Sequence, residues 1–393
     1  MRNVGGHTKA ASYHSFPSNA RILGAQEAIK IAQLEYNNIR AVHGFAREKG
    51  IECDSWEGET VDVFYDRGQF ENAKKAIQLI TDSAKETGND LNGWASYDVW
   101  DQDEVVQRFG VNGKGVVGGV SYYAGSIHAY KFVIGLLKRC LELQMTLFTE
   151  TPVSSVEQGA DGKWIVVTKQ GVIRANRVVL ATNAYTAFLK KDFQGSIVPL
   201  RGQVTVQRPG KEMHSIRENL AGTYSFVYKE GYDYMIRRPQ GTECENQMVI
   251  GGGLTKAAQE GLYEYGNTDD STLNSDISAY LRESLLQHFG VETWGEDHKD
   301  GRVMTEWSGI MGYSPDGYPF VGQVVDEDGL WVSAGFQGHG MVLCFMCAKA
   351  LVEMVMGRKA ELYDWFPKVW EVSKERMQKK FEGRLHVSGG SDE

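Results

Sequence analysis

The stretch from Leu330 to Met341, LWVSAGFQGHGM, constrains the fold of this chain more than any other. Its apolar start, LWVSA, predicts a buried strand, and the following residues predict a turn built on Gly335, Gly338 and Gly340. Met341 to Met356 is apolar and predicts a helix that Gly357 ends. A strand, a glycine turn and a helix bring backbone amides and the positive end of a helix close to a bound anion or polar ring. The alternative is an ordinary tight turn in a buried strand–helix unit, and the glycine spacing alone does not decide between them.

Composition narrows the classes of protein to consider. The chain has 393 residues and a net charge of −9, which allows one large or two interleaved domains and argues against a nucleic-acid partner. No run of apolar residues is long enough to predict a membrane span, so we expect no membrane partner. The five cysteines lack the spacing of a zinc site or a disulfide framework, so we expect no metal site and a reducing, cytoplasmic location.

Periodicity and turn residues predict alternating helices and strands. We expect helices at Ala25–Lys49, Gln69–Thr87, Asp101–Phe109, Ala129–Leu143 and Leu273–Phe289. We expect strands at Thr60–Tyr65, Val116–Tyr123, Met145–Phe148, Val153–Glu157, Trp164–Thr168 and Arg177–Ala181. Residues 1–20 read as a loop, residues 197–253 as an antiparallel sheet, and Met304–Pro319 as a turn-rich segment.

A second glycine pattern, GKGVVG, contains Gly113, Gly115 and Gly118 in the spacing G-x-G-x-x-G. That spacing binds a dinucleotide only where a strand precedes it and a helix opens within it. Here a helix-like segment precedes the glycines and a strand follows, so the geometry is inverted. We therefore interpret this stretch as a loop that enters a sheet.

Six segments along the chain form a recognisable series. They read RNVGGHTKAASY, AGSIHAYKFVIGLLKRC, TETPVSSVE, VVLATNAYT, TEWSGIMGYSPDGYPFVG and AGFQGHGM. In this order they resemble the D-amino-acid oxidase/glycine oxidase superfamily of FAD-dependent oxidoreductases, and within it the amine oxidase-like branch of fungi and bacteria. The resemblance implies an α/β (α+β) fold, in which a Rossmann-like FAD domain is interleaved with an antiparallel-sheet substrate domain. The implied FAD domain comprises residues 1–55, 116–200 and 301–393, and the substrate domain residues 56–115 and 201–300.

The resemblance also implies which residues bind FAD. The turn would wrap the flavin ring with Gly335, Gln337, Gly338, His339, Gly340 and Met341. The N-terminal segment would pass along the ring with Arg2, Asn3, Gly5, Gly6 and His7. Val153 would meet the adenine, and the ribityl and pyrophosphate groups would lie near Ala181, Thr182 and Asn183. Sarcosine-oxidase-like members attach the flavin to a cysteine at a position similar to Gly309, where this chain has none nearby, so we expect non-covalent FAD.

Four residues are candidates for the reacting side of the ring. The resemblance places His7 and Lys9 beside the flavin, although both could belong to an ordinary surface loop. Tyr232 and Tyr234 would cover the substrate face, where aromatic rings can form a cage for an amine. Cross-strand packing would explain the two tyrosines equally well. Because amine oxidation by flavin does not strictly require a side-chain base, no acid or base is assigned.

The chain departs from the family pattern at two places. Members open with a strand, a G-x-G-x-x-G turn, a helix and an acidic strand before the segment that corresponds to RNVGGH, which is where this sequence begins. We therefore expect an N-terminally incomplete FAD domain or a truncated gene model. In addition, Val342 stands where sarcosine-oxidase-like members place a lysine that holds the substrate carboxylate. This favours an amine, or a larger metabolite whose acid is held elsewhere, over a simple amino acid.

The expected function is oxidation of a C–N bond in an amine or amino-acid-like small molecule, by hydride transfer to flavin N5 and with molecular oxygen as acceptor. One alternative is a catalytically impaired or non-catalytic remnant of the same fold. Another keeps the flavin but oxidises a C–C or C–O bond.

Overall fold

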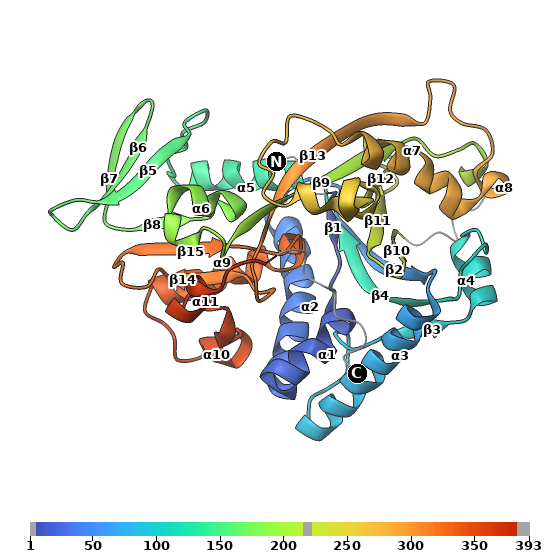
Figure 1. The fold of residues 1–393 in the computed structure, drawn as a ribbon, viewed down its shortest axis with the longest axis horizontal. Helices are drawn as coiled ribbons and strands as arrows, with labels where there is room; N and C mark the ends of the chain where they lie inside the picture. The colour runs from blue at the N-terminus through green and yellow to red at the C-terminus, as the bar shows by residue number, and fades with distance from the viewer. Residues whose placement is uncertain (1–4, 215–221, 383–393) are drawn as a thin grey trace.

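A nine-stranded mixed sheet forms the centre of the structure, a computed structural model that describes residues 5–214 and 222–382 (Figure 1). The strand order is β1-β4-β2-β10-β11-β12-β9-β13, and β3 pairs with β4. The strands are β1 (His7–Thr8), β2 (Trp56–Phe64), β3 (Asp98–Trp100), β4 (Gly118–Ser126), β9 (Val198–Gln207), β10 (Thr223–Val227), β11 (Tyr232–Arg237), β12 (Met248–Gly251) and β13 (Val303–Tyr313). Strands β9 to β13 pair antiparallel where they are neighbours, as predicted for residues 197–253, whereas β10 pairs with β2 in parallel.

Helices pack around this sheet and join it to two smaller sheets. The α-helices are α1 (Ser12–Leu23), α2 (Ala25–Glu48), α3 (Arg67–Thr87), α4 (Gln102–Phe109), α5 (Ala129–Glu142), α6 (Thr186–Leu189), α7 (Ser275–Phe289), α8 (Val291–Trp294), α9 (Cys344–Val355), α10 (Leu362–Trp365) and α11 (Lys374–Gln378). Helix α3 is capped at both ends: Asp66 accepts from Gln69 N at its start, and Gly88 ends it in the left-handed conformation. The mixed α/β class predicted from the sequence is confirmed.

The two faces of the large sheet have different roles. Because side chains alternate along a strand, one face carries Val63, Phe226 and Met235, which pack with Leu281 and Phe289 of α7 into the largest buried core cluster. The opposite face carries a row of directly paired residues: Asp62, Ser225, Tyr234, Gly251, Val204 and Trp307. This second face, which we call the site face, meets the N-terminal segment.

Two three-stranded sheets complete the fold. One has the order β14-β15-β8, with β14 (Phe320–Gln323) antiparallel and β8 (Val178–Leu180) parallel to β15 (Leu330–Ala334). The other contains β5 (Val153–Gln158), β6 (Trp164–Thr168) and β7 (Gly171–Ala175). Figure 1 shows this second sheet projecting at one end of the molecule. The first sheet directs the chain into the glycine turn.

Three sequence predictions about secondary structure are wrong. Met145–Phe148 is not a strand, because no neighbouring strand among the described residues pairs with it, and Leu147 and Phe148 are exposed. The loop predicted for residues 1–20 contains β1 and the start of α1. The turn-rich segment Met304–Pro319 instead continues β13 to Tyr313, since pairing with β9 stabilises a strand whose glycines had suggested turns.

The structure also defines the elements that follow the two glycine patterns. The helix expected from Met341 begins as α9 at Cys344, after the 3₁₀ turn η7 (Gly340–Val342). Gly118 opens β4, so the G-x-G-x-x-G pattern enters a sheet, as the sequence indicated. The division into two domains stays a prediction. None of the described helices is long and apolar enough to cross a bilayer.

Candidate active site

The N-terminal segment lies against the site face of the large sheet. His7 and Thr8 pair with Ser126 and Gly125 of β4. A Cβ added to Gly5 would lie 2.6 Å from Cε2 of Tyr234, and one added to Gly6, where φ is +100°, would overlap the carbonyl oxygen of Ile127. Only glycines permit this approach. The GGH part of the segment is thereby fixed beside Tyr234.

His7 is a neutral imidazole in this environment. Burial and the positive charge of Lys9 lower the pKa of His7 to about 3, against a smaller opposite effect of Asp62. Its Nε2 atom is buried and has no hydrogen-bond partner among the described residues. The ring centroids of His7 and Tyr234 are 6.2 Å apart. His7 therefore offers an unused polar atom beside the sheet, as a ligand-binding imidazole would.

A buried ion pair lies next to His7. The Lys9 ammonium is 2.7 Å from Asp62 Oδ1 and donates to Ser225 Oγ at 2.7 Å. Asp62 also accepts hydrogen bonds from Tyr13 and, at 2.9 Å, from Tyr122. Burial alone would raise the pKa of Asp62. Lys9 and His14 lower it by more than burial raises it, so the pKa of Asp62 lies well below its usual range. The pair is thus a fixed dipole at the base of the site.

The glycine turn between β15 and α9 is held by two asparagine side chains. Asn183 Oδ1 accepts from the backbone amides of Gly335 and Phe336, at 2.9 and 3.3 Å. Asn38 of α2 donates to the Met341 carbonyl and accepts from Met346 N. Asn183 itself has φ +45°, a conformation that asparagine tolerates better than most residues. Neither asparagine is adjacent in sequence to the turn, so tertiary contacts determine its shape.

Within the turn, backbone amides remain available to a ligand. Gln337 N donates to Gly312 O, and His339 N donates to Phe336 O. The amides of Gly338, Gly340 and Met341 have no backbone acceptor among the residues that the structure describes. Gly340 and Met341 open η7, and the first amides of a helical turn have no acceptor within it.

Two polar side chains of the turn have defined orientations. Gln337 donates from Nε2 to Ser314 Oγ at 2.6 Å, and its buried Oε1 has no partner in the described part of the chain. His339 Nδ1 is 2.9 Å from the Gln337 carbonyl oxygen, which can only accept, so Nδ1 carries the proton. Burial lowers the pKa of His339 despite that hydrogen bond. His339 is therefore neutral near pH 7, with Nε2 as an acceptor.

Tyr313 connects the turn to the large sheet, and Tyr232 acts electrostatically on Tyr313. A Cβ added to Gly338, where φ is +73°, would lie 3.1 Å from Met311 Sδ and 3.2 Å from the Tyr313 hydroxyl. Tyr232 is 50% exposed, yet burial of its hydroxyl by surrounding protein raises its pKa, with a further contribution from Asp62. Cys344 is also exposed, and desolvation raises its pKa to about 12. Both groups therefore keep their protons near neutral pH.

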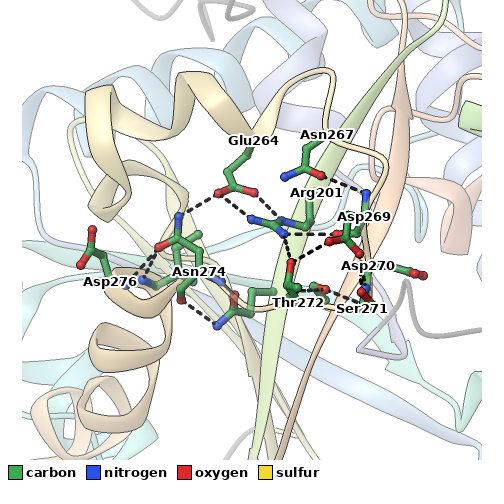
Figure 2. Close-up of polar contacts among 12 residues, drawn as sticks. Arg201, Glu264, Asn267, Asp269, Asp270, Ser271, Thr272, Asn274 and Asp276 are labelled. Atoms are coloured by element: carbon green, nitrogen blue, oxygen red, sulfur yellow. Dashed lines mark hydrogen bonds and ion pairs between the residues drawn. The ribbon is translucent and has the colours of Figure 1, made fainter.

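On the face of the large sheet opposite the site face, an ion pair and hydrogen bonds hold the loop that borders the site (Figure 2). Arg201 of β9 pairs with Glu264 at 2.6 Å and donates to Thr272 and to the Asp269 carbonyl. Both charged side chains are almost fully buried, so removing one would leave the other uncompensated. The loop places Tyr265 with its ring centroid 6.1 Å from that of Tyr313.

The remaining predicted residues are less closely connected. Ala181 and Thr182 follow β8, and Thr182 Oγ1 bonds Thr186 Oγ1 at 2.9 Å. Val153 opens β5 in the separate small sheet. Arg2 and Asn3 lie outside the described residues. The binding roles of all these residues stay predictions.

The sequence did not single out Asp62, Tyr313 or Asn38. Asp62 interrupts the apolar strand VDVF, and a buried acid in such a strand could have indicated a site. Tyr313 lay in a segment predicted as turns. Asn38 gave no signal, because a polar residue on a long helix is usually solvated.

These residues fit a bound FAD. A flavin ring needs hydrogen-bond donors and acceptors along its edge, and the site offers the amides of the turn, the unpaired His7 Nε2 and the unpaired Gln337 Oε1. The glycines at positions 5, 6 and 338 let the two segments pack closely on Tyr234, Ile127 and Tyr313, which fixes these donors and acceptors in place. Among the described residues, no group of three or more His, Cys, Asp and Glu side chains is placed to hold a metal ion.

Comparison with known proteins agrees with this assignment. The family model "DAO: FAD dependent oxidoreductase" matches residues 5–354. The "Probable oxidoreductase OrdL" of Rhizobium meliloti is 23% identical over 87% of this chain and 71% of its own length. The glycine oxidase of Pseudomonas aeruginosa is 23% identical over 55% of this chain and 51% of its own.

A solved structure shows the same fold. Glycine oxidase from Geobacillus kaustophilus superposes with a TM-score of 0.68 at 15% identity, covering 88% of this chain and 83% of its own. The family match spans most of the chain, and it includes both the N-terminal segment beside Tyr234 and the glycine turn around Gly338. The chain therefore belongs to the DAO family of FAD-dependent oxidoreductases, and FAD is its cofactor.

Proposed function

We propose that this protein oxidises a C–N bond in a small-molecule amine or amino-acid-like compound, with molecular oxygen as the electron acceptor. One observation carries the proposal: the two segments suited to a flavin ring, Gly5–His7 and Gly335–Met341, converge on tyrosines of the sheet. The names of related proteins, among them glycine oxidases, support a nitrogen-containing substrate.

Bound FAD would supply a two-electron acceptor for the hydride of a carbon next to an amine nitrogen. Loss of that hydride from a neutral amine leaves an iminium ion, which water converts into a carbonyl compound and an amine. Oxygen takes up the two electrons with two protons to give hydrogen peroxide.

The residues of this chain contribute position and environment. His7 and His339 are neutral, so they do not repel a cationic amine, and His339 Nε2 can accept an N–H hydrogen bond. Burial raises the pKa of Tyr232, Tyr234 and Tyr313, so their hydroxyls donate hydrogen bonds and stay protonated. A desolvated site also favours the neutral amine that oxidation requires.

A second candidate is a member of the family that retains FAD weakly and turns over little. Strand β8 is the terminal strand of a sheet that contains three strands among the described residues, and Val179 on it is 49% exposed. A sheet that ends in an exposed strand would hold a cofactor beside it less firmly.

The experiment is to purify the protein with added FAD, remove the free flavin and record the visible spectrum. Under anaerobic conditions, amines and amino acids are then added, and hydrogen peroxide is measured after air is admitted. Bleaching by an amine and subsequent peroxide formation support the proposal. Retained flavin that only alcohols or C–H acids bleach would contradict it, and a protein without flavin would favour the second candidate.

A further inference from the structure

The site face presents an aromatic surface toward the segments that hold the flavin ring. Tyr232 and Tyr234 alternate on β11 with Asp233, which points into the opposite core. The Tyr234 ring fits between the backbones of Gly5 and Gly251, since a Cβ at either would lie about 2.6 Å or less from it. Trp307 and Val204 continue the surface beside Tyr234.

Tyr313 closes the other end of this surface. It lies on the same face of β13 as Trp307, and its hydroxyl reaches the glycine turn at Gly338. Met311 lies beside it, also within reach of Gly338. Tyr234 thus meets the N-terminal segment, and Tyr313 meets the turn. We call Tyr232, Tyr234 and Tyr313 the tyrosine surface.

The charges around the tyrosine surface do not suit a carboxylate. Among the residues that the structure describes, the charged or titratable groups that act on its hydroxyls after desolvation are Asp62 and neighbouring tyrosines, and all of them raise the hydroxyl pKa. The nearby ammonium of Lys9 is already paired with Asp62 and Ser225. Its charge acts instead on His7 and His339, on the side of the ring-binding segments.

A carboxylate that entered this surface would lose its hydration and meet neutral hydroxyls and a buried carboxylate. Burying an ion without an opposite charge is costly, whereas an aromatic or aliphatic body gains from leaving water. Aromatic faces also attract the positive end of an amine before it loses its proton.

We propose that the tyrosine surface selects an amine that has an aromatic or apolar body and carries no carboxylate. The inference rests on the proposed function, because it concerns the same site. It goes further by excluding glycine-like and sarcosine-like compounds as preferred substrates.

Binding to the oxidised, FAD-loaded protein tests this without turnover. Benzyl alcohol and benzoate have similar rings but differ in charge, and each is titrated while the change in flavin absorption is followed. We expect benzyl alcohol to bind at least about tenfold more tightly than benzoate, since only the latter buries an unpaired charge. Tyr232→Leu should alter the affinity for benzyl alcohol, whereas Tyr263→Leu, at a residue 66% exposed on a loop, should not.

Anaerobic flavin reduction then compares N-methylbenzylamine with sarcosine, which has a carboxylate in place of the ring. Faster reduction by N-methylbenzylamine supports the inference. Equal or tighter binding of benzoate, absence of benzyl alcohol binding, or faster reduction by sarcosine overturns it. Reduction by sarcosine would still be oxidation of a C–N bond, so it would contradict the inference and leave the proposed function intact. Selective binding of benzyl alcohol without reduction by any amine would contradict the proposed function alone.

Discussion

Asn183 and Gly335, which are 152 positions apart, are joined by a 2.9 Å hydrogen bond from the Gly335 amide to the Asn183 side-chain oxygen. The same oxygen accepts from Phe336. The end of β8 thereby fixes the start of the glycine turn, and Asn38 fixes its end from α2. Two parts of the chain that are distant in sequence therefore hold the turn at its start and at its end.

Removal of the Asn183 acceptor should weaken FAD binding. Asn183→Gly preserves the positive φ but leaves two turn amides without their acceptor, which costs about 1–3 kcal/mol and should raise the dissociation constant of FAD about tenfold or more. Asn183→Asp retains an acceptor and serves as the control. Flavin fluorescence during titration of the FAD-free protein measures both. Equal affinity in the two variants would contradict the role of this hydrogen bond.

Gly338 should tolerate no side chain. Gly338→Val forces a β-branched residue into φ +73° and brings a Cβ against Met311 and Tyr313, so we expect little retained flavin. Gly357→Val has the same φ of +73° with no atom within 4 Å of the added Cβ, and it controls for backbone strain alone. The ratio of flavin to protein absorbance after gel filtration compares them. Similar flavin content in both variants would show that close approach at Gly338 is unimportant.

Glu35 gives a prediction about pH. Burial raises the pKa of Glu35 to about 7, although its carboxylate accepts from Ala11 N and Lys9 is near. The ordinary value near 4.3 holds in the unfolded chain, so the folded state binds the proton more tightly. The associated stability is complete below about pH 4 and is lost as pH rises through about 7.

Glu35→Gln removes this titration and keeps an acceptor for Ala11 N. We expect the free energy of unfolding of the variant to be about 1–3 kcal/mol higher than that of the parent at pH 8. At pH 4 the two values should differ little. Urea denaturation at both pH values measures the difference, and Glu361→Gln, an exposed acid, serves as control. A constant difference across pH would contradict the assignment.

Lys9 and Asp62 should stabilise the fold only when both charges are present. Asp62→Asn leaves a nearly buried ammonium without its counter-charge, which typically costs about 3–5 kcal/mol. The double variant Lys9→Met with Asp62→Asn should recover part of that loss. Thermal unfolding of the three variants tests this, and additive losses in the double variant would show that the two residues act independently.

The sequence predicted the elements whose signals are local. The glycine turn, β15 and most of α2, α3 and α7 were found because periodicity and glycine stops lie within the segments themselves. The placement of Gly5–His7 and Gly335–Met341 on one flavin site comes from resemblance to a family and stays a prediction.

Features that depend on distant partners were missed. Strand β13 exists because β9 pairs with it, and Met145–Phe148 fails to form a strand because no partner lies beside it. The sequence did not indicate that the Asn183 side-chain oxygen accepts from the turn amides of Gly335 and Phe336, and its predicted place near the cofactor stays a prediction. Asp62 owes its low pKa to Lys9, which is brought near it by the packing of β1 against β4.

The central claim is that this FAD-dependent protein breaks the C–H bond next to an amine nitrogen. The most direct measurement is anaerobic stopped-flow reduction of the flavin by N-methylbenzylamine and by the same amine with deuterium on its benzylic carbon. The account predicts that deuterium slows the absorbance decrease severalfold, because transfer from that carbon is part of the reduction. Identical rates for the two amines, or no reduction by either while flavin stays bound and another class of compound reduces it, would contradict the claim.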